Sequence, residues 1–260
     1  MAYQPFNLQG KTALVTGGNG GIGYGMAEAL LASGANVAIW GSRAEKTEQA
    51  KAKLIEACGD ASRVHAFACD VGDEAALEAT FAETVKALGG RVDSCFANAG
   101  VSGKGKTLLD LSLDDWQRVQ RVNVEGVFMT FRAAAKHMIE GGHGGSLVAT
   151  ASTAAIEGAA RNSAYGASKG AVTSFVRAVA VELARYKIRA NSILPGWIVT
   201  EMTEKSVGND KFANAVMPRI PARRWGTWDD FGGIAVYLAS EASSYHTGEQ
   251  FIIDGGYTKF

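Results

Sequence analysis

Seven short, mostly apolar runs recur along the 260-residue chain, and a longer segment with helical character follows most of them. This alternation is typical of βαβ units, in which each helical crossover places the next strand parallel to the last. Several runs are apolar at nearly every position, as expected for strands covered by helices on both faces. We therefore predict an α/β fold with a doubly wound, seven-stranded parallel sheet. Its predicted strands are 12–16, 36–40, 63–68, 92–97, 146–151, 189–194 and 250–254.

No repeat, charge block or Pro/Ser-rich linker interrupts this pattern, and the chain has only four prolines. A single α/β domain often reaches about 200–250 residues, so we predict one domain over 1–260 that carries both the cofactor and the substrate site. The irregular stretches 99–112 and 195–226 both follow predicted strands. Open α/β sheets bind ligands at the carboxyl ends of their strands, which makes these two stretches the expected site loops.

The balance of charge argues against large anionic partners. Lys plus Arg and Asp plus Glu number 26 each, so no excess positive field favours nucleic acid or a membrane surface. We also find no secretory leader and no run of about 18 apolar residues, and we expect a cytoplasmic protein with a small-molecule partner.

Metal chemistry is not indicated. The three cysteines, Cys58, Cys69 and Cys95, are widely spaced, and the four histidines show no HExxH-type spacing. We expect reduced thiols and no metal site.

A glycine-rich turn directly follows the first predicted strand. It reads Thr16-Gly-Gly-Asn-Gly-Gly-Ile-Gly23 and leads into a helical segment. Glycines at such a turn let the backbone approach a pyrophosphate, while the helix N-terminus faces the phosphate charge. Two registers of a glycine motif fit this turn. One is GxGxxG on Gly18, Gly20 and Gly23, and the other is TGxxxGxG on Gly17, Gly21 and Gly23. Both predict a dinucleotide-binding (Rossmann) site.

The end of the second predicted strand indicates which dinucleotide binds. An NAD site usually places Asp or Glu there to hold the ribose 2′-hydroxyl, whereas this chain reads Gly41-Ser42-Arg43. A guanidinium forms charge-assisted hydrogen bonds with phosphate. We therefore favour NADP(H) over NAD(H), with an exposed helix-start role for Arg43 as the alternative.

A tyrosine and a lysine lie four positions apart after the fifth predicted strand. Tyr165 and Lys169 would share one helix face, and Ser152 ends the preceding strand. A nearby cation favours the phenolate of a tyrosine, whose unperturbed pKa is near 10. This arrangement predicts that Tyr165 is a general acid or base, with Ser152 bonded to the same substrate oxygen.

These motifs together resemble the short-chain dehydrogenase/reductase family, in its branch of roughly 250-residue enzymes, over nearly the whole chain. The family's TGxxxGxG is Thr16 to Gly23 and its YxxxK is Tyr165 to Lys169. Its NNAG, PGxIxT and TGxxxxxDGG elements correspond to 97–100, 195–200 and 247–256. Two departures stand out: Ala97 replaces the first Asn of NNAG, and Gly20 stands where many NADP-using relatives carry a basic residue.

The resemblance implies roles for individual residues. The catalytic set would be Asn123, Ser152, Tyr165 and Lys169, with Asn123 holding a water that links Lys169 to solvent. Asp70 and Val71 would border the adenine, Asn98 would steady the central strand, and Ile198 and Thr200 would meet the nicotinamide carboxamide. The full cofactor set is Gly17, Asn19, Gly21, Ile22, Gly23, Ser42, Arg43, Asp70, Val71, Asn98, Ala99, Gly100, Tyr165, Lys169, Pro195, Gly196, Ile198 and Thr200.

The resemblance also implies the reaction and the assembly. We expect hydride transfer between NAD(P)(H) and a secondary alcohol or ketone, with a sugar, a polyol, a 3-oxoacyl thioester or a cyclic ketone as open substrate classes. An NAD(P)-dependent epimerase or dehydratase is the alternative class, although such enzymes usually carry a longer substrate region. Relatives pair the long helices that correspond to 114–139 and 163–186, which implies a homotetramer. The substrate would contact 102–106, 153–162 and 197–217, where Glu157 and Arg161 are either ligands or solvated charges.

Overall fold

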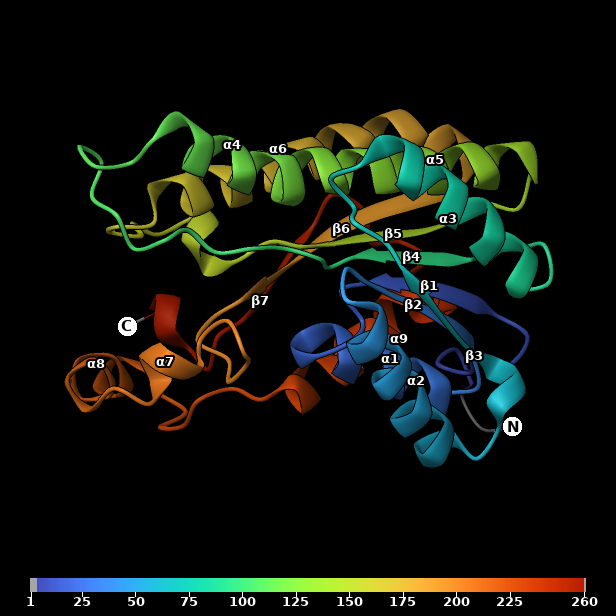
Figure 1. Cartoon of the computed structure of the whole chain (residues 1–260). Helices are drawn as coiled ribbons and strands as arrows, with labels where there is room; N and C mark the ends of the chain where they lie inside the picture. Colours follow the sequence, from blue (N-terminus) through green and yellow to red (C-terminus); the bar gives the residue numbers. More distant parts are fainter. Residues whose placement is uncertain (1–3, 260) are drawn as a thin grey trace.

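The computed structural model describes residues 4–259. Seven parallel strands form one sheet in the order β3-β2-β1-β4-β5-β6-β7 (Figure 1). The doubly wound α/β fold is therefore confirmed, although residues 1–3 and 260 of the predicted domain lie outside the described residues. The strands are β1 Thr12–Thr16, β2 Asn36–Gly41, β3 Val64–Ala68, β4 Ser94–Ala97, β5 Gly145–Thr150, β6 Ile188–Pro195 and β7 Gln250–Ile253.

The strand order reverses beside β1. This strand pairs with β2 on one side and β4 on the other, so the two halves of the chain extend in opposite directions from it. At such a reversal, the loops leaving the two strands turn to opposite faces of the sheet and leave a crevice between them. The reversal places the predicted site at the carboxyl ends of β1 and β4.

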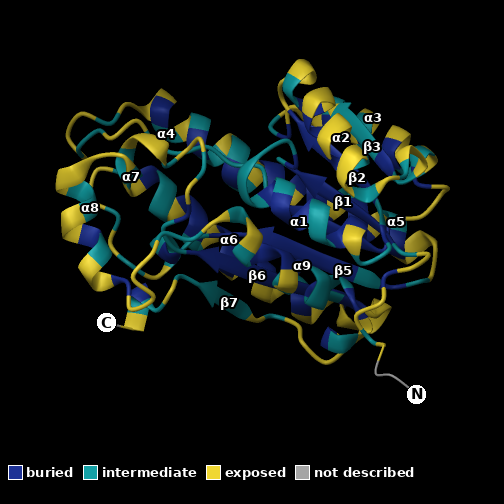
Figure 2. Cartoon of the chain, turned by 90° about the horizontal axis from the view of Figure 1, so that it is seen from below, coloured by how far each residue is buried: buried dark blue, intermediate teal, exposed yellow. Residues whose placement is uncertain are grey.

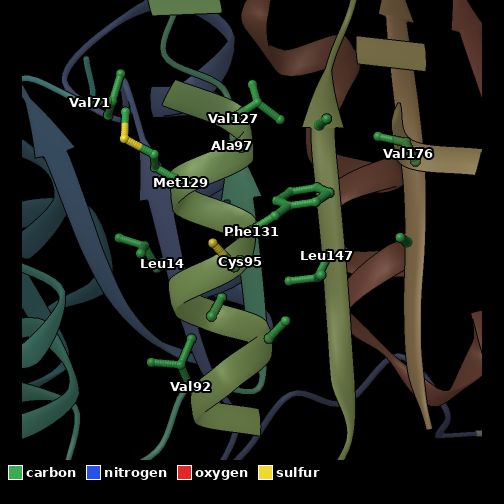
Figure 3. Close-up of a cluster of buried hydrophobic side chains, with 14 of the residues drawn as sticks. Leu14, Val71, Val92, Cys95, Ala97, Val127, Met129, Phe131, Leu147 and Val176 are labelled. Atoms are coloured by element: carbon green, nitrogen blue, oxygen red, sulfur yellow. The ribbon is translucent and has the colours of Figure 1, made fainter. Parts of the chain in front are cut away.

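Helices cover both faces of the sheet and enclose two hydrophobic cores (Figure 1). Leu14 of β1 joins one core, and its neighbours Ala13 and Val15 join the other, because successive side chains of a strand point to opposite faces. In Figure 3, Met129 and Phe131 lie against the strand residues of the first core. That face carries α3 Glu74–Ala87, α4 Leu113–Gln120, α5 Gly126–Glu140 and α6 Ser163–Leu183, and the opposite face carries α1 Gly21–Ala32, α2 Ala44–Cys58 and α9 Gly232–Ala239.

The helix predicted over 114–139 is not one regular helix. A π-helical segment, Arg121–Glu125, separates α4 from α5. A π segment changes the direction of the side chains that it carries, and such segments are frequent at functional sites. Here the buried side chain is Asn123. The helix predicted over 163–186 is α6 followed by a 3-10 turn, Ala184–Tyr186.

Two short helices, α7 Glu204–Val207 and α8 Asp210–Val216, extend beyond the sheet between β6 and β7 (Figure 1). Their outer surface is largely exposed (Figure 2). A small core of their own holds them in place, formed by Val216, Ile220 and Tyr257 with partly buried aromatic neighbours. This segment begins at the residues that follow β6 and so flanks the carboxyl end of the sheet.

Candidate active site

The glycine turn forms the floor of the site. Gly17 and Gly21 have φ values of +65° and +52°, a left-handed conformation that favours glycine. A Cβ atom on Gly23 would lie 2.4 Å from the carbonyl oxygen of Gly17, so the helix can approach the strand only without a side chain there. The positive φ angles match the TGxxxGxG register. The first turn of α1 has no side-chain cap, which leaves its N–H groups for a phosphate.

A cleft of about 560 Å³ runs along the carboxyl ends of the strands. It brings together predicted cofactor residues from the glycine turn, from β2, from the end of β4 and from the segment after β6. Gly23 and Asn123 do not line it: Gly23 packs beneath the turn, and Asn123 lies behind the cleft wall. The predicted residues on the cleft wall are Gly17, Asn19, Gly21, Ile22, Ser42, Arg43, Asp70, Val71, Asn98, Ala99, Gly100, Ser152, Tyr165, Lys169, Pro195, Gly196, Ile198 and Thr200.

Asn98 connects the three central strands at their carboxyl ends. Its side-chain amide donates to the carbonyl of Thr16 at 3.1 Å, and its backbone N–H donates to the Thr16 hydroxyl at 3.0 Å. The Thr150 hydroxyl donates to the Asn98 side-chain oxygen at 3.0 Å. One amide therefore fixes β1, β4 and β5 relative to each other beside the cleft.

Tyr165, Lys169 and Ser152 all line the cleft. Lys169 is only 4% exposed, and its ammonium donates to the Thr150 carbonyl at 2.7 Å. The ammonium lies 5.5 Å from the centroid of the Tyr165 ring. The Ser152 side chain is hydrogen-bonded to the side chain of Tyr165 and accepts from the backbone N–H of Ala154 at 3.1 Å. The backbone of its own loop therefore helps to orient the Ser152 side chain.

Burial shifts the pKa values of Tyr165 and Lys169 in opposite directions. Burial raises the pKa of Tyr165, and its hydrogen bond with Ser152 only partly opposes that effect. Burial also lowers the pKa of Lys169 to about 8. Lys169 is not among the groups that shift the pKa of Tyr165 here, so the role of Lys169 in favouring the phenolate stays a prediction. Tyr165 keeps its proton at neutral pH, which suits an acid that protonates a carbonyl oxygen.

Asn123 shapes the cleft without reaching it. Its side-chain oxygen accepts from the backbone N–H of Val101 at 2.8 Å, and its amide donates to the carbonyl of Val101 and to the Ser168 hydroxyl, both at 3.0 Å. The side chain is fully buried in the π segment. It links the loop after β4 to α6, the helix that carries Tyr165 and Lys169.

Several cleft residues were missed by sequence reasoning, notably Lys46, Arg118, Arg121 and Glu201. Glu201 forms ion pairs with Arg43 at 3.0 Å and with Lys46 at 2.5 Å. The nearer of these cations is 155 residues away in the chain, so no local spacing marks the contact. The only available signal was position, since Glu201 directly follows Thr200 of the PGxIxT element.

The predicted substrate loops are held by ion pairs and by aromatic packing. Lys104 and Lys106 both bind the buried carboxylate of Asp115 at 2.7 Å, which fixes the loop after β4 to α4. Burial raises the pKa of Glu157, and the charge that opposes this shift is Arg219. The carboxylate of Glu157 is therefore influenced by Arg219, which the sequence analysis did not single out.

The cleft has the features that a dinucleotide needs. Its floor excludes side chains at Gly17 and Gly23, a Cβ on Gly17 lying 2.9 Å from the Ala99 backbone. An uncapped helix N-terminus and the cations of Arg43 and Lys46 supply positive charge for phosphates. In 4–259, no group of three or more His, Cys, Asp or Glu side chains is placed to hold a metal ion. Nor does any helix in this range have the length and apolarity to span a membrane.

The fold and the site define an α/β oxidoreductase with a dinucleotide cleft, and comparison with known proteins agrees. A family model described as enoyl-(acyl carrier protein) reductase matches residues 17–258. Sorbose reductase of Schizosaccharomyces pombe is 38% identical over 257 residues, which is 97% of each chain.

Two solved structures are also similar. One is a short-chain type dehydrogenase/reductase from Mycobacterium marinum, with 36% identity, 98% of each chain covered and a TM-score of 0.92. The other is a gluconate 5-dehydrogenase from Burkholderia cenocepacia in complex with NADP and tartrate, with 33% identity, coverage of 99% of this chain and 98% of that one, and a TM-score of 0.92. The chain belongs to the short-chain dehydrogenase/reductase family, and it is an NAD(P)-dependent oxidoreductase that acts on CH–OH groups.

The hydrogen bonds of Asn123 predict a stability effect. Asn123→Ala leaves both backbone groups of Val101 without their partner, so we expect the free energy of unfolding to fall by about 1–3 kcal/mol. Ser168→Ala removes only one of the three bonds and should cost less. Chemical denaturation of the two variants and the wild type measures the difference. Equal stability of Asn123→Ala and the wild type would contradict the assignment.

Proposed function

We propose that the enzyme interconverts a hydroxyl and a keto group on a sugar or polyol. The observation that carries this proposal is the meeting of Ser152, Tyr165 and Lys169 in a cleft with a dinucleotide floor. The substrate class is supported by the similarity to a sorbose reductase and a gluconate 5-dehydrogenase. One domain would carry both the cofactor and the substrate site.

In this proposal the bound nicotinamide supplies or accepts the hydride, and the protein manages the proton. Tyr165 donates its hydroxyl proton to the substrate oxygen during reduction, because burial keeps that proton in place at neutral pH. The Ser152 hydroxyl binds the same oxygen as charge develops on it. The Lys169 ammonium, held by the Thr150 carbonyl, stabilises the phenolate left after transfer. Asn123 supports this set through Val101 and α6, and we retain the proposal that it holds a relay water.

The remaining site residues are assigned to the cofactor. We propose that Asp70 and Val71 border the adenine, that the turn from Gly17 to Gly23 receives the pyrophosphate, and that Ile198 and Thr200 contact the carboxamide. The lining of the cleft supports these roles, since Asp70, Val71, the glycine turn, Ile198 and Thr200 all contribute to it.

We expect purified enzyme to turn over sugars or polyols with either nicotinamide cofactor, followed by the absorbance of the reduced nicotinamide. A panel of ketoses, polyols, cyclic ketones and a 3-oxoacyl thioester tests the substrate class.

Tyr165→Phe should lower turnover by about 10²–10⁴, the effect of losing a positioned acid or base. Tyr186→Phe, on an exposed tyrosine at the end of α6, is the matched control. Retention of more than about a tenth of wild-type turnover by Tyr165→Phe, with chemistry rate-limiting, would remove Tyr165 from this role. Preference for the thioester would remove the sugar proposal alone.

We propose a preference for NADP(H) over NAD(H). Arg43 lines the cleft, and its side chain is 65% exposed, so it can reach a ribose phosphate. Space for an NAD-type carboxylate at the end of β2 is already filled. A Cβ atom on Gly41 would lie 2.0 Å from the Asn19 amide and 2.5 Å from the Thr47 hydroxyl.

We expect kcat/KM to favour NADPH over NADH by about tenfold to a hundredfold, the value of one charge-assisted contact of roughly 1.5–3 kcal/mol. Arg43→Ala should shrink the ratio. Ser42→Asp, at an exposed position, should shift it toward NADH by repelling the phosphate. A wild-type preference for NADH, or a ratio that Arg43→Ala does not change, would make Arg43 an ordinary exposed residue.

We also propose a homotetramer in the cytoplasm. Phe128 of α5 and Val181 of α6 are 42% and 82% exposed, on helices that cover one face of the sheet. Clustered apolar residues on a helix surface are typical of association sites. Sedimentation at micromolar concentration should give a tetramer, and Val181→Lys should shift it toward smaller species. A wild-type monomer would contradict the proposal.

A further inference from the structure

Glu201 links the two walls of the cofactor cleft. Its carboxylate accepts from Arg43 at 3.0 Å and from Lys46 at 2.5 Å, and both cations lie at the start of α2. On the other wall, Glu201 directly follows Thr200, whose methyl group would lie 3.1 Å from a Cβ on Gly21. The segment after β6 therefore approaches the glycine turn and contributes an anion to two cations across the cleft.

Lys46 reaches the glycine turn from α2. Its ammonium lies 3.1 Å from the position that a Cβ on Gly20 would take, so the lack of a side chain at Gly20 makes room for it. The side chain is only 26% exposed, against 65% for Arg43. Lys46 is thus the less exposed of the two cations, and its charge lies beside Gly20.

These charges stand at the junction of two cavities. A second hollow of about 740 Å³ adjoins the cleft, and both are lined by Arg43, Lys46 and Glu201. The junction is therefore open from both sides to a group that enters with the cofactor. The second hollow also contains Tyr24 and Trp228, whose rings pack edge to face at 5.5 Å.

A carboxylate between two cations marks a place where an anion is stable. The hydrogen bond from Lys46 and the neighbouring Arg43 lower the pKa of Glu201, so it is ionised at neutral pH. Exposed ion pairs are nevertheless weak. A phosphate carries about twice the charge of a carboxylate and three acceptor oxygens, so it should displace Glu201 from the same cations.

We propose that Lys46 is a second specificity-determining residue for the ribose 2′-phosphate, and that Glu201 is an internal anion that competes with this phosphate for Lys46 and Arg43. The inference rests on the proposed preference for NADP(H) and adds two residues to it. A 2′-phosphate must replace the carboxylate, whereas a 2′-hydroxyl leaves the ion pairs in place. Glu201 therefore lowers the preference for NADP(H) that the two cations would otherwise give.

The test for Lys46 uses adenosine 2′,5′-bisphosphate and adenosine 5′-monophosphate, whose binding is measured by calorimetry without turnover. Lys46→Met should weaken the bisphosphate about tenfold and leave the monophosphate within about twofold. Lys51→Met is the matched control, because Lys51 lies on the same helix, pairs only with Glu48 among the described ion pairs, and is not on the cleft wall. Equal loss of both ligands, or no loss of either, would overturn the role of Lys46.

For Glu201 we expect the opposite change in the affinity for the bisphosphate. Glu201→Gln should tighten the bisphosphate at least about threefold and leave the monophosphate unchanged, because the competing charge is gone. Glu204→Gln, three residues further along the exposed segment, is the control for net charge. Unchanged or weaker binding of the bisphosphate by Glu201→Gln would show that Glu201 does not compete.

The outcomes separate this inference from the proposed cofactor preference. If wild-type enzyme binds the two ligands equally and Arg43→Ala changes neither, the preference for NADP(H) itself fails. If Arg43→Ala weakens only the bisphosphate while Lys46→Met and Glu201→Gln leave it unchanged, the preference stands and this inference alone is overturned.

Discussion

The hydrogen bonds between Thr16 and Asn98 hold β1 against β4 where the strand order reverses, and the site depends on this junction. A parallel sheet exposes its last backbone groups at the carboxyl edge, where each must find a partner. Asn98 satisfies the end of β1 and accepts from Thr150 of β5. The Thr150 carbonyl in turn holds the ammonium of Lys169. One chain of polar contacts thus runs from the glycine turn to Lys169.

Burial determines what the catalytic residues can do. Lys169 lies among buried groups, and the resulting desolvation lowers its pKa, while the same effect raises the pKa of Tyr165. Both shifts favour the neutral form, and they move the two pKa values apart, since that of Tyr165 rises while that of Lys169 falls to about 8. A neutral tyrosine carries the proton that the proposed reduction must deliver to the substrate oxygen.

Local patterns predicted the strands, the glycine turn and the Tyr165/Lys169 pair, because each depends on residues close in sequence. The π segment around Asn123 was not predictable, since periodicity continues through it and only the tertiary bonds to Val101 and Ser168 select it. The spacing of Tyr165 and Lys169 predicts their proximity, whereas the burial that raises the pKa of Tyr165 depends on the tertiary fold. The roles assigned to individual cofactor residues stay predictions, although the cleft brings most of them together.

The two groups of charged residues in the cleft differ in their exposure to solvent. Lys169 is buried and its contacts are fixed by packing, so changes in salt or in surface charge have little effect on it. By contrast, the side chains of Arg43 and Glu201 are 65% and 68% exposed, and their attraction is screened by salt. A substitution among these exposed residues changes which anion the cations bind without disturbing the proton transfer. Under the proposed roles, the core constrains the chemistry of the reaction, whereas a few charges on the cleft wall set the choice between cofactors, so this choice can change independently of the chemistry.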